Sequence, residues 1–368
     1  MTKLGVLALA GPDFGGTYQY TLAMLQALRH TRGFAVTLYG DPDNPDFRQT
    51  GYPIIPFAES RARQLVALAA ARLQIGLPDP FAAQDILLAP IYSLMLLHTL
   101  RPFAYTLHDL QERYYPENFN GAQRAWRHQV HAQLLKRTQR VICESNHVKR
   151  DIVRFFGVPE ARATVLPAPP QQQFLAPLDE AALRAVRDRL QLPERFLFYP
   201  AQFWPHKNHL RLVAAFREVA NDVPDLKLVL TGKKRDDYEM VMRAVATLGL
   251  SGHVLHLGYV AQDDLRAIYA LASALVMPSL FESISIPVYE AFEIGTPVAA
   301  SNVLAIPEQV GDAGMLFDPT SVPAMRDAMM KVIDPAVAAQ LAARGRQRMA
   351  QMTPERYGAG LQSLLESL

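Results

Sequence analysis

Cysteine is almost absent from this chain of 368 residues: Cys143 stands alone, so no intramolecular disulfide can form. Runs of about 18 consecutive apolar residues are absent too, so we expect no membrane-spanning helix. The apolar stretch 4–10 at the N-terminus is short and meets Gly11-Pro12 at once, which favours a buried first strand over a signal peptide. We therefore predict a cytoplasmic protein built around a hydrophobic core.

Basic residues are concentrated in one stretch, although the net charge is only +2. Residues 121–154 hold eight of them against two acidic residues. This stretch could meet a phosphorylated acceptor or the anionic inner face of a membrane, as could the basic helix expected at 61–72. It could equally be a solvated helix face. Nucleic acid is disfavoured because the whole chain is close to neutral. The basic residues are Arg124, Arg127, Lys136, Arg137, Arg140, Lys149, Arg150 and Arg154.

Apolar strand-like runs alternate with helical patterns along the whole chain, which predicts parallel sheets covered by helices. The proline-rich stretch 167–173 interrupts this periodicity and is typical of a linker. Strands are expected at 4–10, 34–39, 86–89, 103–107, 140–143, 164–166, 196–200, 227–232, 254–257, 274–278 and 297–300, with a short pair around 314–317. Helices are expected at 17–30, 122–138, 208–220, 236–248, 262–272, 287–294 and 353–368.

These elements predict an α/β protein with two doubly wound, Rossmann-like domains. The first is expected over residues 1–170 and the second over 171–350. The helix within 351–368 is expected to pack back on the first domain. In doubly wound folds ligands bind at the carboxyl ends of the strands, so we expect a ligand cleft between the domains.

Two features of the first half are candidate binding or catalytic sites. Gly15-Gly16 lies between the first strand and a helix, where amides can approach an anion without Cβ interference, although a ligand-free tight turn would look the same. His108 follows the strand 103–107, at the ligand edge of the sheet. The alternative is a structural histidine bonded to Asp109.

Two further features lie in the second half. Lys207 is placed just before a helix, where a cation is unfavourable without a compensating anion, and it could reach a pyrophosphate. Glu282 lies in the loop before Pro287, which marks the first turn of the next helix, and Glu290 lies one turn inside. The two carboxylates can flank one ligand while the amides of 283–286 face its anionic oxygens. A hydrolytic acid–base pair or plain surface charge are the alternatives.

Taken together and in this order, these features resemble the family-four retaining glycosyltransferases of the GT-B fold. The resemblance covers essentially the whole chain and is densest over 196–318. It is carried by the blocks Tyr199-Pro200-Ala201-Gln202, Lys207-Asn208, Leu257-Gly258-Tyr259-Val260, Pro278-Ser279-Leu280-Phe281-Glu282, Tyr289-Glu290-Ala291, Gly295-Thr296-Pro297-Val298 and Pro307-Glu308. The Glu-x7-Glu spacing within this frame is its most specific part.

The resemblance implies a role for each candidate in binding a nucleotide-diphosphate sugar. Glu290 would hold the ribose hydroxyls and Glu282 the donor-sugar hydroxyls, while Lys207 would neutralise the diphosphate. The Gly15-Gly16 turn would let the first domain close over the donor, and His108 would contact its sugar near the reacting carbon. The remaining donor-binding positions implied are Gln202, the base cradle around Tyr259, and the phosphate loop Ser283, Ile284, Ser285 and Ile286.

Two positions depart from the family's pattern. Gln202 stands where the family usually has arginine, which removes one phosphate cation. Ser283 and Ser285 stand where it usually has glycine, which makes the phosphate loop less open, although a serine hydroxyl can itself donate to phosphate. The resemblance implies catalytic roles for His108, Lys207 and Glu282.

The resemblance also implies transfer with retention at the anomeric carbon. We predict no essential metal, because no Asp-x-Asp metal motif lies in a convincing loop. Asp41-Pro42-Asp43 reads as a turn rather than a metal motif. GDP-mannose is the donor favoured by the resemblance, with UDP-glucose next, and a saccharide or lipid-linked acceptor of surface polysaccharide synthesis is expected. An epimerase or hydrolase on the same fold, or a non-catalytic sugar-nucleotide binder, are the competing hypotheses.

Overall fold

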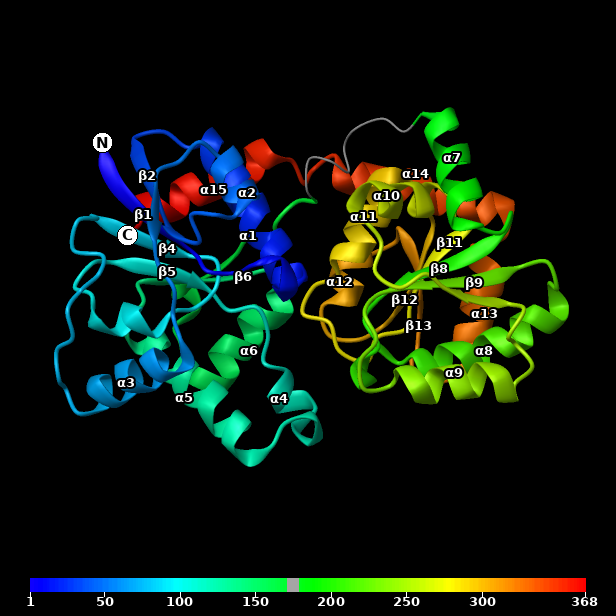
Figure 1. The fold of residues 1–368 in the computed structure, drawn as a ribbon, viewed down its shortest axis with the longest axis horizontal. Coiled ribbons are helices and arrows are strands. Elements are labelled where there is room, and N and C mark those ends of the chain that lie inside the picture. Colours follow the sequence, from blue (N-terminus) through cyan, green and yellow to red (C-terminus); the bar gives the residue numbers. More distant parts are fainter. Residues whose placement is uncertain (171–178) are drawn as a thin grey trace. The chain divides into compact units, whose positions relative to one another are not determined.

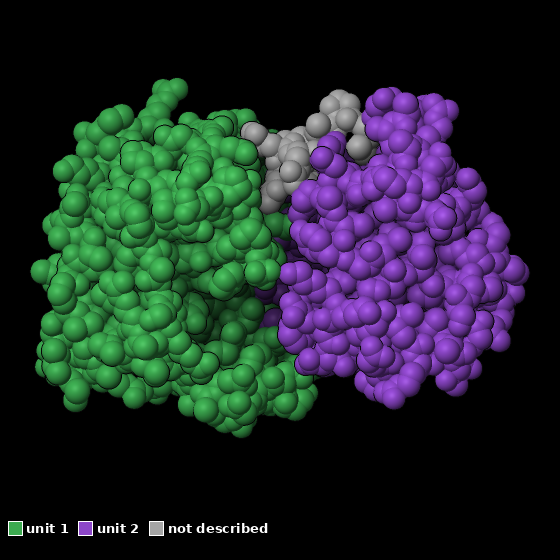
Figure 2. Space-filling view, viewed as in Figure 1, with its two compact units in different colours: residues 1–169, 352–368 green, residues 170–351 purple. Residues whose placement is uncertain are grey.

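The computed structural model describes residues 1–170 and 179–368, and the chain divides into two compact units. Unit 1 comprises residues 1–169 and 352–368, and unit 2 comprises residues 170–351 (Figure 2). Residues 167–170 of the predicted linker form neither helix nor strand, and its residues 171–173 lie outside the described residues.

Unit 1 contains a seven-stranded parallel sheet in the order β3-β2-β1-β4-β5-β6-β7 (Figure 1). The helix α15 of unit 1 comes from the C-terminal end of the chain. The strands are β1 (Thr2–Ala8), β2 (Phe34–Gly40), β3 (Ile54–Pro56), β4 (Ile86–Ala89), β5 (Phe103–Thr106), β6 (Arg140–Cys143) and β7 (Ala163–Val165). The main helices are α1 (Gly16–Ala27), α2 (Pro45–Gln49), α3 (Arg61–Arg72), α4 (Gln111–Tyr114), α5 (Gly121–Arg137), α6 (Asn146–Phe156) and α15 (Pro354–Glu366).

Both faces of this sheet are buried, as the alternation of side chains along β4 shows. Leu87 and Ala89 belong to one hydrophobic cluster, which α3, α5 and α6 cover, whereas Ile86 and Leu88 belong to a second, which α1 and α15 cover. Strands buried on both faces read as continuous apolar runs, which is why the sequence located them.

The C-terminal helix α15 packs against the end of α1. Thr353 caps it, its side chain accepting a hydrogen bond from the Arg356 amide at 3.3 Å. Gly358 lets the helix approach closely, because a Cβ at this position would lie 2.8 Å from the carbonyl oxygen of Ala27.

Unit 2 contains a six-stranded parallel sheet in the order β10-β9-β8-β11-β12-β13. Its strands are β8 (Phe196–Pro200), β9 (Lys227–Thr231), β10 (Val254–His256), β11 (Ala274–Met277), β12 (Val298–Ser301) and β13 (Gly314–Phe317). Its helices are α7 (Glu180–Leu190), α8 (His209–Asp222), α9 (Tyr238–Thr247), α10 (Gln262–Leu271), α11 (Ile286–Ile294), α12 (Ile306–Val310), α13 (Val322–Val332) and α14 (Pro335–Met349).

The two parallel sheets with their helices confirm the predicted doubly wound α/β class. The pair of short strands expected around 314–317 is instead the single strand β13, which pairs with β12, and the strand β3 and the helices α6, α13 and α14 were not predicted. Within the described residues, none of the helices combines the length and the apolar composition needed to cross a membrane.

Candidate active site

An ion pair between Lys207 and Glu282 lies at the carboxyl ends of the strands of unit 2. Lys207 ends the short 3-10 helix η7 (Pro205–Lys207) after β8, and Glu282 lies in the loop after β11. The Nζ of Lys207 donates to Oε1 of Glu282 at 2.6 Å. The anion that compensates a lysine next to a helix start is therefore, in this structure, the neighbouring glutamate.

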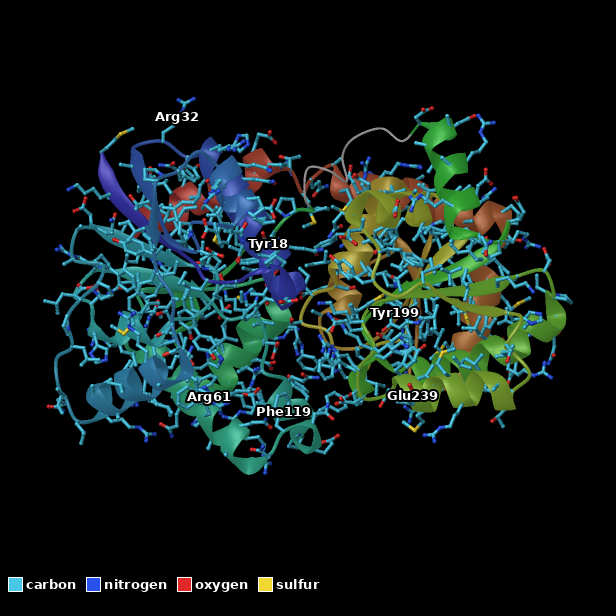
Figure 3. The ribbon with its side chains drawn as sticks, viewed as in Figure 1. Tyr18, Arg32, Arg61, Phe119, Tyr199 and Glu239 are labelled. Atoms are coloured by element: carbon cyan, nitrogen blue, oxygen red, sulfur yellow. The ribbon has the colours of Figure 1, made fainter. Side chains whose placement is uncertain are left out.

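The two loops that carry this ion pair are held together by buried polar side chains. Asn208 takes a left-handed conformation (φ 60°) and its Nδ2 donates to the carbonyl oxygen of Pro278 at 2.9 Å. The buried hydroxyl of Tyr199, labelled in Figure 3, donates to the carbonyl oxygen of Lys207 at 2.9 Å and lies 3.1 Å from Oγ of Ser279. The position of the cation is thus fixed relative to the loop of its partner.

Glu290 is buried on the second turn of α11, which begins at Ile286 and has Pro287 in its first turn as predicted. The hydroxyl of Tyr269 donates to its Oε2 at 2.8 Å. Burial raises the pKa of Glu290 to about 7, although the hydrogen bond from Tyr269 acts in the opposite direction. The carboxyl group therefore changes its charge near neutral pH, and its charged form can accept hydrogen bonds from a ligand's hydroxyl groups.

The loop 283–286 is less open than the sequence predicts. Gln309 of α12 brackets Ser285: its Oε1 accepts from the Ser285 amide at 2.9 Å and its Nε2 donates to the Ser285 carbonyl oxygen at 2.6 Å. The prediction that all four amides face an anion is therefore wrong for Ser285. Within the described residues, the amides of Ser283, Ile284 and Ile286 have no hydrogen-bond partner and remain available.

The Gln202 side chain is engaged by an arginine from a neighbouring loop. Arg235 donates from Nε to Oε1 of Gln202 at 2.8 Å. Tyr259, in the predicted base cradle, follows β10 and is 72% exposed, with Nζ of Lys233 5.8 Å from its ring centre. Gln202, Arg235 and Tyr259 therefore follow β8, β9 and β10, respectively, at the same edge of the sheet.

In unit 1, His108 is held by two acceptors. Its Nδ1 lies 2.9 Å from Oε2 of the buried Glu144 and its Nε2 lies 2.9 Å from the carbonyl oxygen of Pro90. Because neither partner can donate, the doubly protonated ring satisfies both contacts. Burial acts to lower the pKa of His108, but the hydrogen bond and charge of Glu144 outweigh it and raise the pKa. The expected alternative partner, Asp109, instead pairs with Arg127 at 2.6 Å.

The Gly15-Gly16 turn and His108 lie at the same edge of the seven-stranded sheet. Gly15 has φ 57° and ψ −121°, a conformation that glycine adopts readily, and α1 begins at the next residue. From α1, the ring of Tyr20 meets the His108 ring edge-on, with centroids 4.9 Å apart. The turn thus starts the helix that packs against the histidine.

Five residues that sequence reasoning did not select complete these two sites: Glu144, Asn208, Arg235, Tyr269 and Gln309. Only Asn208 adjoins a predicted site residue in the sequence. The others carried no local signal, because their partners lie between 21 and 36 residues away. As to metals, nowhere in the described part of the chain do three His, Cys, Asp or Glu side chains gather as a metal site requires.

Family models match both units. The model for glycosyl transferases group 1 matches residues 185–348, and the model for glycosyltransferase family 4 matches residues 14–169. The chain belongs to family four of the GT-B glycosyltransferases. The predicted family and fold are thereby confirmed.

Curated relatives of this glycosyltransferase include O-antigen enzymes. It is 28% identical to the O-antigen chain mannosyltransferase B of Escherichia coli, over 62% of this chain and 61% of that protein. It is 24% identical to the O-antigen chain mannosyltransferase RfbU of Salmonella typhimurium, over 89% of each chain. The match with the serotype-specific mannosyltransferase WbdA of Escherichia coli covers 25% of that longer protein. The chain thus spans 61% of the length of mannosyltransferase B and 25% of that of WbdA, which is less than two thirds of each.

Solved structures agree on the fold. Anabaena HepE, crystallised with UDP and glucose, aligns over 100% of both chains with a TM-score of 0.79 and 18% identity. WaaG, a glycosyltransferase of lipopolysaccharide biosynthesis, aligns over 98% of this chain and 99% of its own with a TM-score of 0.73 and 15% identity. At such identities the likeness bears on the fold alone.

Proposed function

We propose that this protein is a retaining, metal-independent hexosyltransferase that uses a nucleotide-diphosphate sugar. GDP-mannose is the favoured donor because the mannosyltransferases above are its relatives, and UDP-glucose is the next candidate. The acceptor is a saccharide or lipid-linked glycan of surface polysaccharide synthesis. The observation that carries the proposal is the Lys207–Glu282 pair at 2.6 Å, at the sheet edge where α11 presents Glu290.

The donor would bind at this edge of unit 2. Its diphosphate would accept hydrogen bonds from the Nζ of Lys207 and from the available amides before Pro287, because both kinds of donor stabilise negative charge. Glu282, released from the ammonium group, would accept hydrogen bonds from the sugar hydroxyls, and Glu290 would accept them from the ribose. Tyr259 and the backbone beside it would hold the base.

The transfer step breaks the bond between the anomeric carbon and the diphosphate oxygen, which leaves with the electron pair. The acceptor oxygen bonds to the same face of that carbon, and its proton passes to the departing diphosphate. Positive charge held close to the leaving group stabilises the negative charge that grows there, so Lys207 would act mainly in the transition state. We assign unit 2 to the nucleotide sugar and unit 1 to the acceptor, with His108 contacting the donor sugar.

We also propose that α3 of unit 1 contacts an anionic membrane that carries the acceptor. Leu65 and Val66 on this helix are 52% and 57% exposed, and Arg61, labelled in Figure 3, begins it. In the basic stretch 121–154, by contrast, Arg127 is already paired with Asp109. Exposed apolar groups beside basic ones suit a lipid interface.

Vesicle co-sedimentation tests this contact. Binding to vesicles that contain anionic phospholipid should fall on Leu65→Ser with Val66→Ser, whereas Met240→Ser on α9, also exposed, should leave it unchanged. Equal binding to neutral vesicles, or no effect of the double substitution, would remove the membrane proposal.

A panel of nucleotide sugars in thermal unfolding tests the donor. A ligand present at about 100 times its Kd adds about 2.7 kcal/mol of stability. We expect GDP-mannose or UDP-glucose to raise the unfolding temperature, and transfer to appear only when an acceptor is added. Donor turnover without acceptor would instead support an epimerase or hydrolase, and tight binding without any turnover would support a binding protein.

A further inference from the structure

Unit 2 brings an arginine to the loop that carries Lys207. Strands β8 and β9 are parallel neighbours whose last residues, Pro200 and Thr231, pair. Gly232 follows with φ 126°, and a Cβ there would lie 2.4 Å from the carbonyl oxygen of Ala201. The loop after β9 can therefore lie directly against the loop after β8 because residue 232 is glycine.

Two backbone hydrogen bonds hold this approach on either side of Arg235. The amide of Phe203 donates to the carbonyl oxygen of Lys233 at 3.3 Å, and the amide of Asp237 donates to the carbonyl oxygen of Phe203 at 3.0 Å. The ring of Phe203 is fully buried. The backbone that bears Arg235 is thus fastened to the Lys207 loop rather than free in solvent.

The guanidinium of Arg235 is positioned by two neutral groups. Its Nε donates to Oε1 of Gln202 at 2.8 Å, and its Cζ lies 5.1 Å from the centre of the Trp204 ring. Within the described residues Arg235 forms no ion pair, and its two terminal nitrogens donate to no protein group, since its side-chain contacts are those with Gln202 and Trp204. An anchored, exposed and uncompensated guanidinium is suited to two oxygens of one phosphate group.

The charges around Lys207 indicate a function for the guanidinium of Arg235. Lys207 is neutralised by Glu282, and Glu290 adds a further acidic group once it is ionised. A diphosphate at this edge of unit 2 therefore needs further cations. Lys233 and Lys234, on the loop after β9, lie beside the rings of Tyr259 and Tyr238. Arg235, on the same loop, is hydrogen-bonded directly to the loop that carries Lys207.

We propose that Arg235 binds the diphosphate of the donor together with Lys207, and that Gln202 and Trp204 are positioning residues for its guanidinium. The proposal rests on the proposed function and adds a phosphate-binding residue to it. It also gives Gln202 a purpose: an amide oxygen accepts from the arginine without cancelling its charge, whereas a carboxylate there would cancel it.

Calorimetric titration with GDP and UDP tests the proposal, with guanosine and uridine as probes that have no phosphate. Arg235→Gln should weaken binding of the preferred diphosphate about tenfold or more and leave its nucleoside unchanged. Gln202→Glu should weaken it similarly by pairing with the arginine. The double variant Gln202→Arg with Arg235→Gln should recover most of the affinity, because it puts a guanidinium back at the same place.

Lys234→Gln is the matched control: it removes one charge from the same loop, but its ammonium lies over Tyr238, 4.4 Å from the ring centre. It should change binding by less than about threefold. An equal loss in Lys234→Gln and Arg235→Gln would reduce the effect to general electrostatics and overturn the proposal, as would unchanged binding in Arg235→Gln. If the unsubstituted protein binds neither diphosphate, the proposed function fails with it; if it binds one and Arg235→Gln binds equally, only this inference fails.

Discussion

The carboxyl edges of the two sheets carry charged groups in different states of compensation. In unit 1, His108 has an acceptor at each ring nitrogen, one of them the buried Glu144. In unit 2, Lys207 and Glu282 are bonded to each other, while the side-chain partners of Arg235 among the described residues are the neutral Gln202 and Trp204. The ring nitrogens of His108 therefore both have partners in the protein, whereas the terminal nitrogens of Arg235 keep N–H groups that a ligand can bind.

The shared Rossmann-like topology therefore leaves differently compensated charges at the two edges. Both sheets place helix starts and loop side chains at the same kind of edge. The charges and the partners they already have distinguish the two edges. We expect substitutions in unit 2 to affect donor binding and transfer directly, and substitutions in unit 1 to act through the His108–Glu144 pair.

The largest effect is expected at Lys207. Lys207→Ala should lower kcat/KM for transfer about 100- to 1000-fold, because it removes a cation from the diphosphate and leaves the buried Glu282 unpaired. Steady-state kinetics with GDP-mannose and UDP-glucose would measure it. Lys331→Ala on α13 is the control and should be near neutral. A Lys207→Ala enzyme within tenfold of the unsubstituted rate would place the diphosphate elsewhere.

A smaller effect is expected in unit 1, and it should be shared by two residues. His108→Gln and Glu144→Gln should each lower kcat/KM about 10- to 100-fold, and the double substitution should cost little more, because the side chains act as one pair. NMR titration should show the His108 pKa above its ordinary value and a lower one in Glu144→Gln. Additive losses, or a His108 pKa indifferent to Glu144, would contradict the pairing.

The next effect is a pH dependence from Glu290. With its pKa at about 7, the carboxylate available to the donor grows with pH, so donor affinity should rise up to about tenfold per unit below pH 7 and level off above it. Titration of donor binding between pH 5.5 and 8.5 would show this. In Glu290→Gln binding should be weaker, and this pH slope should be lost. A slope of opposite sign would exclude an ionised Glu290 from donor binding.

The same group makes a prediction about stability. A pKa raised in the folded state gives stability that is present below the ordinary pKa of 4.5 and is lost as pH rises through about 7. The loss should be about 3 kcal/mol in the free energy of unfolding, and Glu290→Gln should flatten it. Urea unfolding at pH 5 and pH 8 would measure the difference.

The smallest expected effect is none at all. We predict that EDTA leaves transfer unchanged, because ammonium, guanidinium and amide groups are proposed to compensate the diphosphate. Activity that is lost in EDTA and restored by magnesium or manganese would show that a divalent cation shares this task.

Most of the fold followed from local patterns, whereas much of the site did not. The strand Ala274–Met277 could be predicted because burial on both faces gives a continuous apolar run. The start of α11 could be predicted because Pro287, with its fixed φ, lies in the first turn. The partners of the site residues leave no such local signal. Glu144 lies 36 residues from His108, and Gln309 lies 24 from Ser285, so only the folded chain brings them together.

Arg235 illustrates the same limit. From the sequence, Gln202 in place of the family's arginine indicated the loss of a phosphate-binding cation. In the structure, Gln202 accepts a hydrogen bond from Arg235, which lies 33 residues away. The departure from the family pattern was visible, but its compensation depended on the close approach at Gly232.

A crystal structure with GDP or UDP bound would show whether unit 2 binds the nucleotide as proposed. We expect the diphosphate at the carboxyl edge of the six-stranded sheet, with the Nζ of Lys207 bonded to a phosphate oxygen and the ribose hydroxyls on Glu290. A nucleotide bound elsewhere, with Lys207 still on Glu282 and Glu290 still on Tyr269, would contradict the proposal.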